Sequence, residues 1–165
     1  MSISVCPHIN YLIMNTLIVW QNSIETVLAL GVGDRIIAGN GVPDKKFFRK
    51  EYQEQYSKIP YTGLQLLDLE TTMMLKPDLL VGWHSTFMPK VLRSTDFWHK
   101  RGVNTFIARS SMIDAKPRTL ANEYKDILDL GKIFDKKECF YEYKIHKQII
   151  LPKTVATTES LQCFL

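Results

Sequence analysis

Short runs of apolar residues alternate with amphipathic segments along most of the chain. Four of these runs predict buried strands over 16–20, 35–38, 79–82 and 103–108. Helical patterns separate them, and strands that alternate with helices form a parallel sheet whose two faces the helices cover. The predicted fold class is therefore α/β, a Rossmann-like three-layer arrangement of a parallel sheet with helices on both faces.

Residues that start and stop helices bound the segments between these strands. Asn22 or Ser23 offers an N-cap with Glu25 in the first turn, and Gly31 ends this helix. Asp68 offers the N-cap of another helix. The remaining pattern predicts helices over 45–57, 68–75 and 87–100, and loops over 39–44 and 60–63.

A longer helical pattern follows the last predicted strand. Thr119 offers its N-cap, and an apolar stripe runs from Leu120 to Ile133. The pattern continues as far as His146, with one expected break near Gly131. We therefore expect the sheet to be followed by a long helix.

The composition is that of an ordinary globular domain. The 165 residues are 23% charged and 45% hydrophobic, which excludes a disordered or low-complexity chain. The net charge is only +4 and no basic stripe is present, so we expect no nucleic-acid partner. The three cysteines are far apart in the sequence, and we expect no metal site. The sequence shows neither a long apolar run nor a basic leader of the kind that begins a secretory signal.

Aromatic residues follow two of the predicted strands. Trp20 ends the first strand, and Trp83, His84 and Ser85 follow the third. Ligands of parallel sheets bind outside the carboxyl ends of the strands, where an aromatic ring provides flat apolar area with a polar tip. A small α/β enzyme with its site near Trp83, His84 and Ser85 is an alternative. However, no GxSxG elbow surrounds Ser85, and no general base has a partner at a reliable spacing.

Three segments, in order, resemble the motifs of one family. Residues 23–37 read SIETVLALGVGDRII, residues 69–80 read LETTMMLKPDLL, and residues 100–106 read KRGVNTF. Together they resemble the first lobe of the substrate-binding proteins that serve ABC importers of iron-siderophores, haem and vitamin B12. The resemblance extends over roughly residues 16–146.

The resemblance implies two α/β lobes joined by a long rigid helix, with the ligand held in the cleft between them. This chain is similar to the first lobe and the connecting helix, and we expect the second lobe to be missing. The expected organisation is an irregular segment 1–15, an N-terminal lobe 16–116, a connecting helix 117–148 and a tail 149–165.

The resemblance also implies a function without catalysis and without a cofactor. The chain would bind a metal chelate as cargo, a ferric siderophore or otherwise haem or cobalamin, and deliver it to a membrane permease. Glu70 would dock onto arginines of that permease, whereas we expect Glu25 simply to cap its helix. Cargo contacts would come from two loops, with these residues: Trp20, Gln21, Asn22, Ser23, Trp83, His84 and Ser85.

Location and assembly follow from the same resemblance. Such proteins work outside the cytoplasm, in the periplasm or as membrane-anchored lipoproteins, and His84 could ligate an exposed metal of the cargo. A lone lobe would expose its cleft face, so we expect a homodimer that covers this face. The alternative is a non-functional remnant of a transporter, or a self-associating interaction module.

Overall fold

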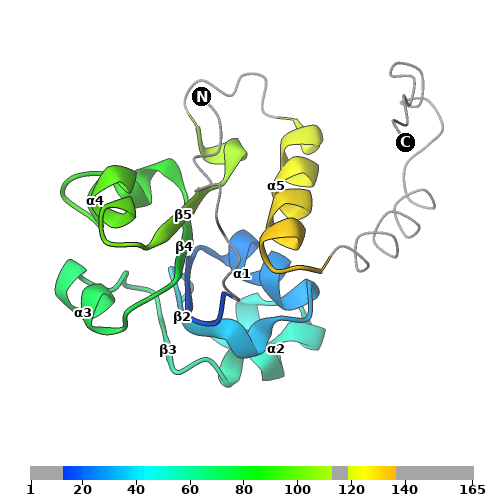
Figure 1. The fold of residues 1–165 in the computed structure, drawn as a ribbon. Coiled ribbons are helices and arrows are strands. Elements are labelled where there is room, and N and C mark those ends of the chain that lie inside the picture. The colour runs from blue at the N-terminus through cyan, green and yellow to red at the C-terminus, as the bar shows by residue number, and fades with distance from the viewer. Residues whose placement is uncertain (1–12, 113–118, 137–165) are drawn as a thin grey trace, which may run out of the picture.

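In the described part of the chain, a parallel sheet of five strands forms the centre of the fold (Figure 1). The computed structural model describes residues 13–112 and 119–136. All four strand pairings are parallel, and the strand order is β3-β2-β1-β4-β5. The strands are β1 (Thr16–Val19), β2 (Ile36–Asn40), β3 (Tyr61–Gly63), β4 (Leu79–Gly82) and β5 (Asn104–Ile107).

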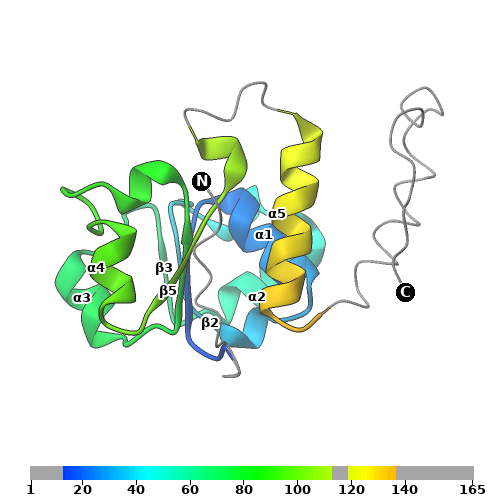
Figure 2. The same ribbon diagram turned by 45° about the horizontal axis from the view of Figure 1, so that its top comes forward.

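Helices cover both faces of this sheet, which confirms the predicted three-layer α/β fold. The α-helices are α1 (Gln21–Ala29), α2 (Lys50–Ser57), α3 (Leu69–Met74), α4 (Thr95–His99) and α5 (Leu120–Ile133). Short 3₁₀-helices are η1 (Gly33–Arg35), η2 (Lys45–Phe47), η3 (His84–Phe87) and η4 (Arg109–Ser111). Figure 2 shows α3 and α4 on one side of the sheet and α1, α2 and α5 on the other.

Alternating side chains of the central strands pack into two separate hydrophobic cores, one on each face of the sheet. Ile18 of β1 packs in the core beneath α1, α2 and α5, whereas its neighbours Leu17 and Val19 pack beneath α3 and α4. In β4, Leu79 and Val81 lie on the α1 side, and Leu80 lies on the α4 side. A strand that is buried on both faces reads as a continuous apolar run, which is why β1 and β4 were predictable from the sequence.

Three predicted boundaries near the start of the chain are wrong. The first helix begins at Gln21, before either predicted cap (Asn22 or Ser23), and Trp20 occupies the N-cap position. β2 continues to Asn40, where we expected a loop. Residues 60–63 were also expected to form a loop, but Tyr61–Gly63 pair with β2 as the edge strand β3.

Two predicted helices are shorter than expected. The segment 45–57 begins with η2 and becomes α-helical only from Lys50. The segment 87–100 is α-helical only over Thr95–His99. Pro89 interrupts the pattern and cannot supply the backbone N–H that a helix interior needs. By contrast, the predicted cap Asp68 is confirmed, since its side chain accepts a hydrogen bond from the backbone N–H of Thr71.

Asp78 and Arg35, which belong to the segments 69–80 and 23–37, join parts of the domain that are far apart in the sequence. The carboxylate of Asp78 accepts hydrogen bonds from the backbone N–H groups of Met14 and Asn15, which fixes the start of β1 beside β4. The guanidinium of Arg35 donates to the carbonyl of Phe134 at the end of α5, over 3.4 Å. A cation at a helix C-terminus satisfies an otherwise unpaired carbonyl and suits the helix dipole.

The last described helix confirms the long helix predicted near the C-terminal end. Thr119 precedes α5 as predicted, but its side chain makes no capping hydrogen bond. The helix passes through Gly131 and ends at Ile133, and Asp135 has a positive φ of 55°, so the expected break lies two residues after Gly131. The predicted tail 149–165, the part of the connecting helix beyond Lys136 and all three cysteines lie outside the described residues.

Candidate functional site

The carboxyl ends of β1 and β4 lie side by side at the centre of the sheet. The chain leaves β1 toward β2 and leaves β4 toward β5, on opposite sides, so a crevice is expected between these two ends. Trp20 follows β1 and Trp83 follows β4, and their ring centroids are 5.3 Å apart with the planes tilted by 35°. The structure therefore brings together the two tryptophans that the sequence analysis singled out.

Trp20 has an unusual backbone conformation. Its φ of 78° and ψ of 143° lie close to a region that is populated almost only by glycine. The backbone N–H of Trp20 donates to the carbonyl of Asn40 over 2.9 Å, which keeps this residue at the end of β2. The indole N–H is buried and has no hydrogen-bond partner among the described residues. A strained residue with an unpaired buried donor is the kind of exception that gathers at binding sites.

Trp83 is the more accessible member of the pair. The side chain is 38% exposed, and its indole N–H donates to the side-chain oxygen of Asn22 over 3.3 Å. This contact joins the first turn of α1, which follows β1, to the segment that follows β4. Trp20, Asn22 and Trp83 thus form one continuous surface of aromatic rings and an amide, which we call the tryptophan platform.

Gln21 and Ser23 contribute differently from their neighbours. The side-chain amide of Gln21 donates to the carbonyl of Phe47 over 2.7 Å and to the carboxylate of Glu25 over 3.2 Å, so it joins α1 to η2. Ser23 is buried, with 4% of its surface exposed. Their roles as cargo contacts stay predictions.

Glu25 does not cap its helix, because α1 starts at Gln21 and its first turn contains no acidic residue. Its carboxylate accepts hydrogen bonds from Gln21 and from the backbone N–H of Arg49. The expected capping role is wrong, and the residue instead helps to fix the segment that leads into α2.

His84 and Ser85 are exposed in η3, directly beside Trp83. The turn is held on its inner side by Thr86, whose hydroxyl accepts from the backbone N–H of Trp83 over 3.2 Å. Within residues 13–112 and 119–136, no group of three His, Cys, Asp or Glu side chains is placed to hold a metal ion.

Arg109 connects the turn after β5 to helix α5. Its guanidinium forms ion pairs with Asp126, at 2.6 Å, and with Asp129, and its backbone N–H donates to Asp126 over 2.8 Å. Burial raises the pKa of the Asp126 carboxyl, while the hydrogen bonds from Arg109 act in the opposite direction. Burial would lower the pKa of Arg109, but the two carboxylates outweigh it and raise that pKa. The guanidinium is therefore protonated and engaged with α5.

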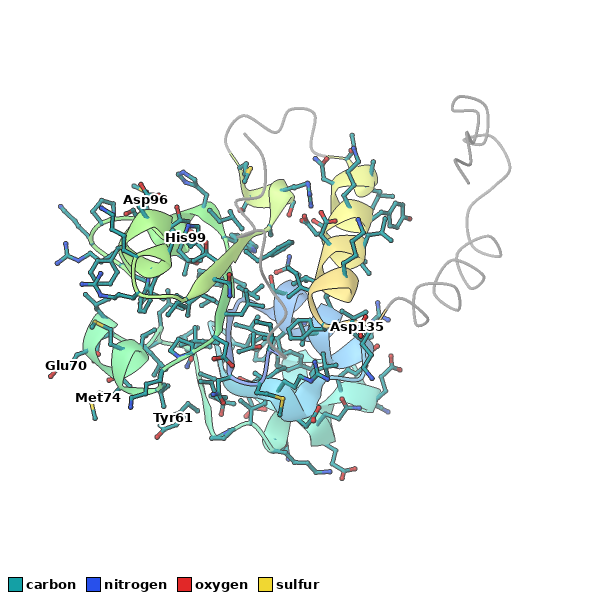
Figure 3. The ribbon with its side chains drawn as sticks, in the orientation of Figure 1. Tyr61, Glu70, Met74, Asp96, His99 and Asp135 are labelled. Atoms are coloured by element: carbon teal, nitrogen blue, oxygen red, sulfur yellow. The ribbon has the colours of Figure 1, made fainter. Side chains whose placement is uncertain are left out.

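Glu70 lies in the first turn of α3, where a carboxylate suits the helix dipole. Figure 3 shows Glu70 and Met74 pointing outward at the edge of the molecule on the α3 side. Met73 and Met74 are exposed on the same helix. The position is accessible for a macromolecular contact, as the predicted docking role requires.

Asn40, Arg109 and Ser111 were not among the residues predicted for the site. Asn40 is buried with its side-chain oxygen unpaired among the described residues, and Ser111 bonds the turn that carries His84. The carboxyl ends of β2 and β5 could be chosen from the strand order alone, but the bonding partners of the residues there depend on the folded sheet.

Comparison with solved structures decides the relationship. A periplasmic binding protein from Veillonella parvula is 47% identical to this chain, with a TM-score of 0.79, over 84% of this chain and 44% of that protein. The chain is homologous to that periplasmic binding protein. It spans about half the length of the solved structures that it matches.

Two further solved structures share the fold of this periplasmic binding protein homologue. The first is an ABC-type Fe3+-hydroxamate transport system from Saccharomonospora viridis, with 18% identity and a TM-score of 0.67 over 84% of this chain and 49% of that one. The second is the periplasmic vitamin B12-binding protein BtuF of Vibrio cholerae, with 17% identity and a TM-score of 0.58 over 84% of this chain and 50% of that one. No family model and no curated protein matches the chain.

These neighbours are substrate-binding transport proteins, which supports the prediction that the chain is not an enzyme. Among the residues that the structure describes in this homologue, no helix combines the length and apolar character needed to span a membrane.

Proposed function

We propose that this chain is the first lobe of a substrate-binding component of an ABC importer, working outside the cytoplasm. The observation that carries the proposal is the tryptophan platform at the carboxyl ends of β1 and β4. The homology to a periplasmic binding protein and the place of this platform at the switch point of a parallel sheet support it. The division into a lobe at 16–116 and a connecting helix at 117–148 is part of the same proposal.

The proposed cargo is a metal chelate that already wraps its metal. Such a molecule needs aromatic walls and a few hydrogen-bonding groups from the protein, and no cluster of metal-ligating side chains. The platform offers two indole rings, an amide and the exposed side chains of His84 and Ser85. A ferric siderophore suits this surface, and haem or cobalamin would also fit.

Replacing Trp83 with alanine is expected to weaken cargo binding at least tenfold. The substitution removes the exposed aromatic wall and frees Asn22. The affinities of haemin, cyanocobalamin and ferrioxamine for the wild-type chain and the variant can be measured by equilibrium titration. Tyr61→Ala is the matched control, since Tyr61 is a comparably exposed aromatic residue on the edge strand β3.

Equal loss in both variants, or none in Trp83→Ala, would contradict the assignment of the site. If the wild-type chain binds none of the three chelates, the remnant or the self-associating module becomes the better interpretation. Dimer formation through the cleft face stays a prediction.

We expect Glu70→Ala to weaken docking onto the permease about tenfold while the fold is retained. The proposed reason is the loss of a carboxylate that bonds an arginine of the permease. The measurement is binding of the chain to membrane vesicles that contain the cognate importer. Glu54→Ala is the control, because Glu54 is an exposed helix carboxylate on α2, on the other face of the sheet. Unchanged docking of Glu70→Ala, with both variants folded by circular dichroism, would remove Glu70 from the interface.

A further inference from the structure

The turn that carries His84 rests on the turn that follows the neighbouring strand. The hydroxyl of Ser111 in η4 accepts a hydrogen bond from the backbone N–H of His84 over 2.9 Å. The same hydroxyl donates to the carbonyl of Ala108 over 2.6 Å, so its orientation is fixed. Beneath these bonds, the backbone N–H of Ala108 donates to the carbonyl of Gly82, which continues the pairing of β4 with β5.

The turn that carries Ser111 is itself anchored on helix α5. Arg109 lies two residues before Ser111 in η4 and pairs with Asp126 and Asp129 of α5. Asp126 accepts from both the guanidinium and the backbone N–H of Arg109, and its side chain is only 8% exposed. A bidentate contact of this kind fixes the orientation of the turn as well as its distance from the helix.

These contacts form a chain of bonds from α5 through Arg109 and Ser111 to His84, which adjoins Trp83. We propose that Ser111 is a positioning residue, which holds the loop of Trp83, His84 and Ser85 in the conformation that binds cargo. The proposal rests on the proposed function of that loop. Ser111 acts through the backbone of His84, and Arg109 supplies the rigid support on α5.

The hydroxyl group matters because the His84 turn is exposed on its outer side. Without Ser111 the N–H of His84 would bond to water, and the turn would lose a fixed point directly beside Trp83. The tilt of Trp83 against Trp20 depends on where that turn lies. A looser turn would populate the binding conformation less often and would reduce the apparent affinity by the same fraction.

The test compares Ser111→Thr with Ser111→Val, two side chains of nearly equal shape of which only the first keeps the hydroxyl. Ser111→Ala is the third variant, and Ser110→Ala is the control in the same turn. Amide hydrogen exchange measured by NMR reports the protection of the His84 N–H. Quenching of tryptophan fluorescence by iodide reports mainly the accessibility of Trp83, because Trp20 is half-buried and Trp98 is buried.

In Ser111→Val and Ser111→Ala we expect the His84 amide to exchange at least tenfold faster and haemin affinity to fall about fivefold. Iodide quenching should also increase, while Ser111→Thr and Ser110→Ala stay close to wild type. A wild-type exchange rate for His84 in Ser111→Val would overturn the proposal, as would equal affinities of the Thr and Val variants.

If the wild-type chain binds no haemin, the affinity comparison is repeated with ferrioxamine. Failure of every chelate overturns the proposed function, while the exchange and quenching data still decide whether Ser111 holds the turn. Should Ser111→Ala fail to fold, the Thr and Val pair still decides.

Discussion

Replacing Arg109 with alanine is expected to lower the free energy of unfolding by about 3 kcal/mol. The guanidinium neutralises Asp126 and Asp129, whose side chains are 8% and 18% exposed. Removal of one partner from a largely buried ion pair leaves the other charge poorly solvated, which costs far more than the pair contributes by attraction alone. Urea unfolding followed by circular dichroism measures the change.

Lys132→Ala provides the matched control for this substitution. Lys132 also pairs with Asp129, at 3.2 Å, but its side chain is 65% exposed. Exposed ion pairs contribute at most about 1 kcal/mol, so we expect little change in the free energy of unfolding. Similar losses in the two variants would show that Arg109 acts as an ordinary surface charge. They would also contradict its role in supporting the Ser111 turn on α5.

Gly41→Ala should also destabilise the protein by about 3 kcal/mol. Gly41 has a φ of 89°, where any residue with a Cβ atom is strained. A Cβ atom built at this position would lie 2.9 Å from Cε3 of the Trp20 ring. The Trp20 ring would have to move away from this atom. Because the ring also packs against Trp83, the change should appear in tryptophan emission as well as in the free energy of unfolding.

Gly102→Ala separates the cost of backbone strain from the cost of the close contact with Trp20. Gly102 has a similar φ of 77°, but its added Cβ would meet no atom within 4 Å in the described part of the chain. Only the backbone strain applies, so a loss of about 1 kcal/mol is expected. If Gly41→Ala costs no more than Gly102→Ala, the close approach of Trp20 has no energetic consequence.

The fold could be predicted where local signals agreed with burial. β1 and β4 are apolar on both faces, and Asp68 is a residue type that commonly caps the start of a helix such as the one from Leu69. β3 could not be found in this way, because its three residues lie between Pro60 and Leu64 and become a strand only through pairing with β2. An edge strand this short depends on its neighbour, which is distant in the sequence.

The segment 87–100 shows the opposite failure. Its apolar residues Phe87 and Leu92 both pack into the core, but Phe87 ends the short 3₁₀-helix η3 and Leu92 lies in a turn before α4. Periodicity reports which residues are buried, and here burial did not require an α-helix.

The candidate site was predictable only in part. Trp20 and Trp83 could be chosen because both follow strands, and adjacent strand ends meet at one edge of the sheet. The strained φ of Trp20 has no signal in the sequence, since local propensity would place glycine there. The contact between Arg109 and Asp126 was hidden as well, because either residue alone reads as an ordinary surface charge.

The order of the strands also decides when the domain can fold during synthesis. Of the five described strands β1 is made first, yet it lies at the centre of the sheet, and its pairing with β4 joins Thr16 to Leu79. Every pairing in the described sheet is parallel, so it needs a crossover connection and forms more slowly than a hairpin. Until the ribosome has delivered β4, the nascent chain carries an apolar strand with one open edge. That edge can pair with a wrong partner throughout this interval, so the rate of translation and the presence of chaperones bear directly on the yield of native protein.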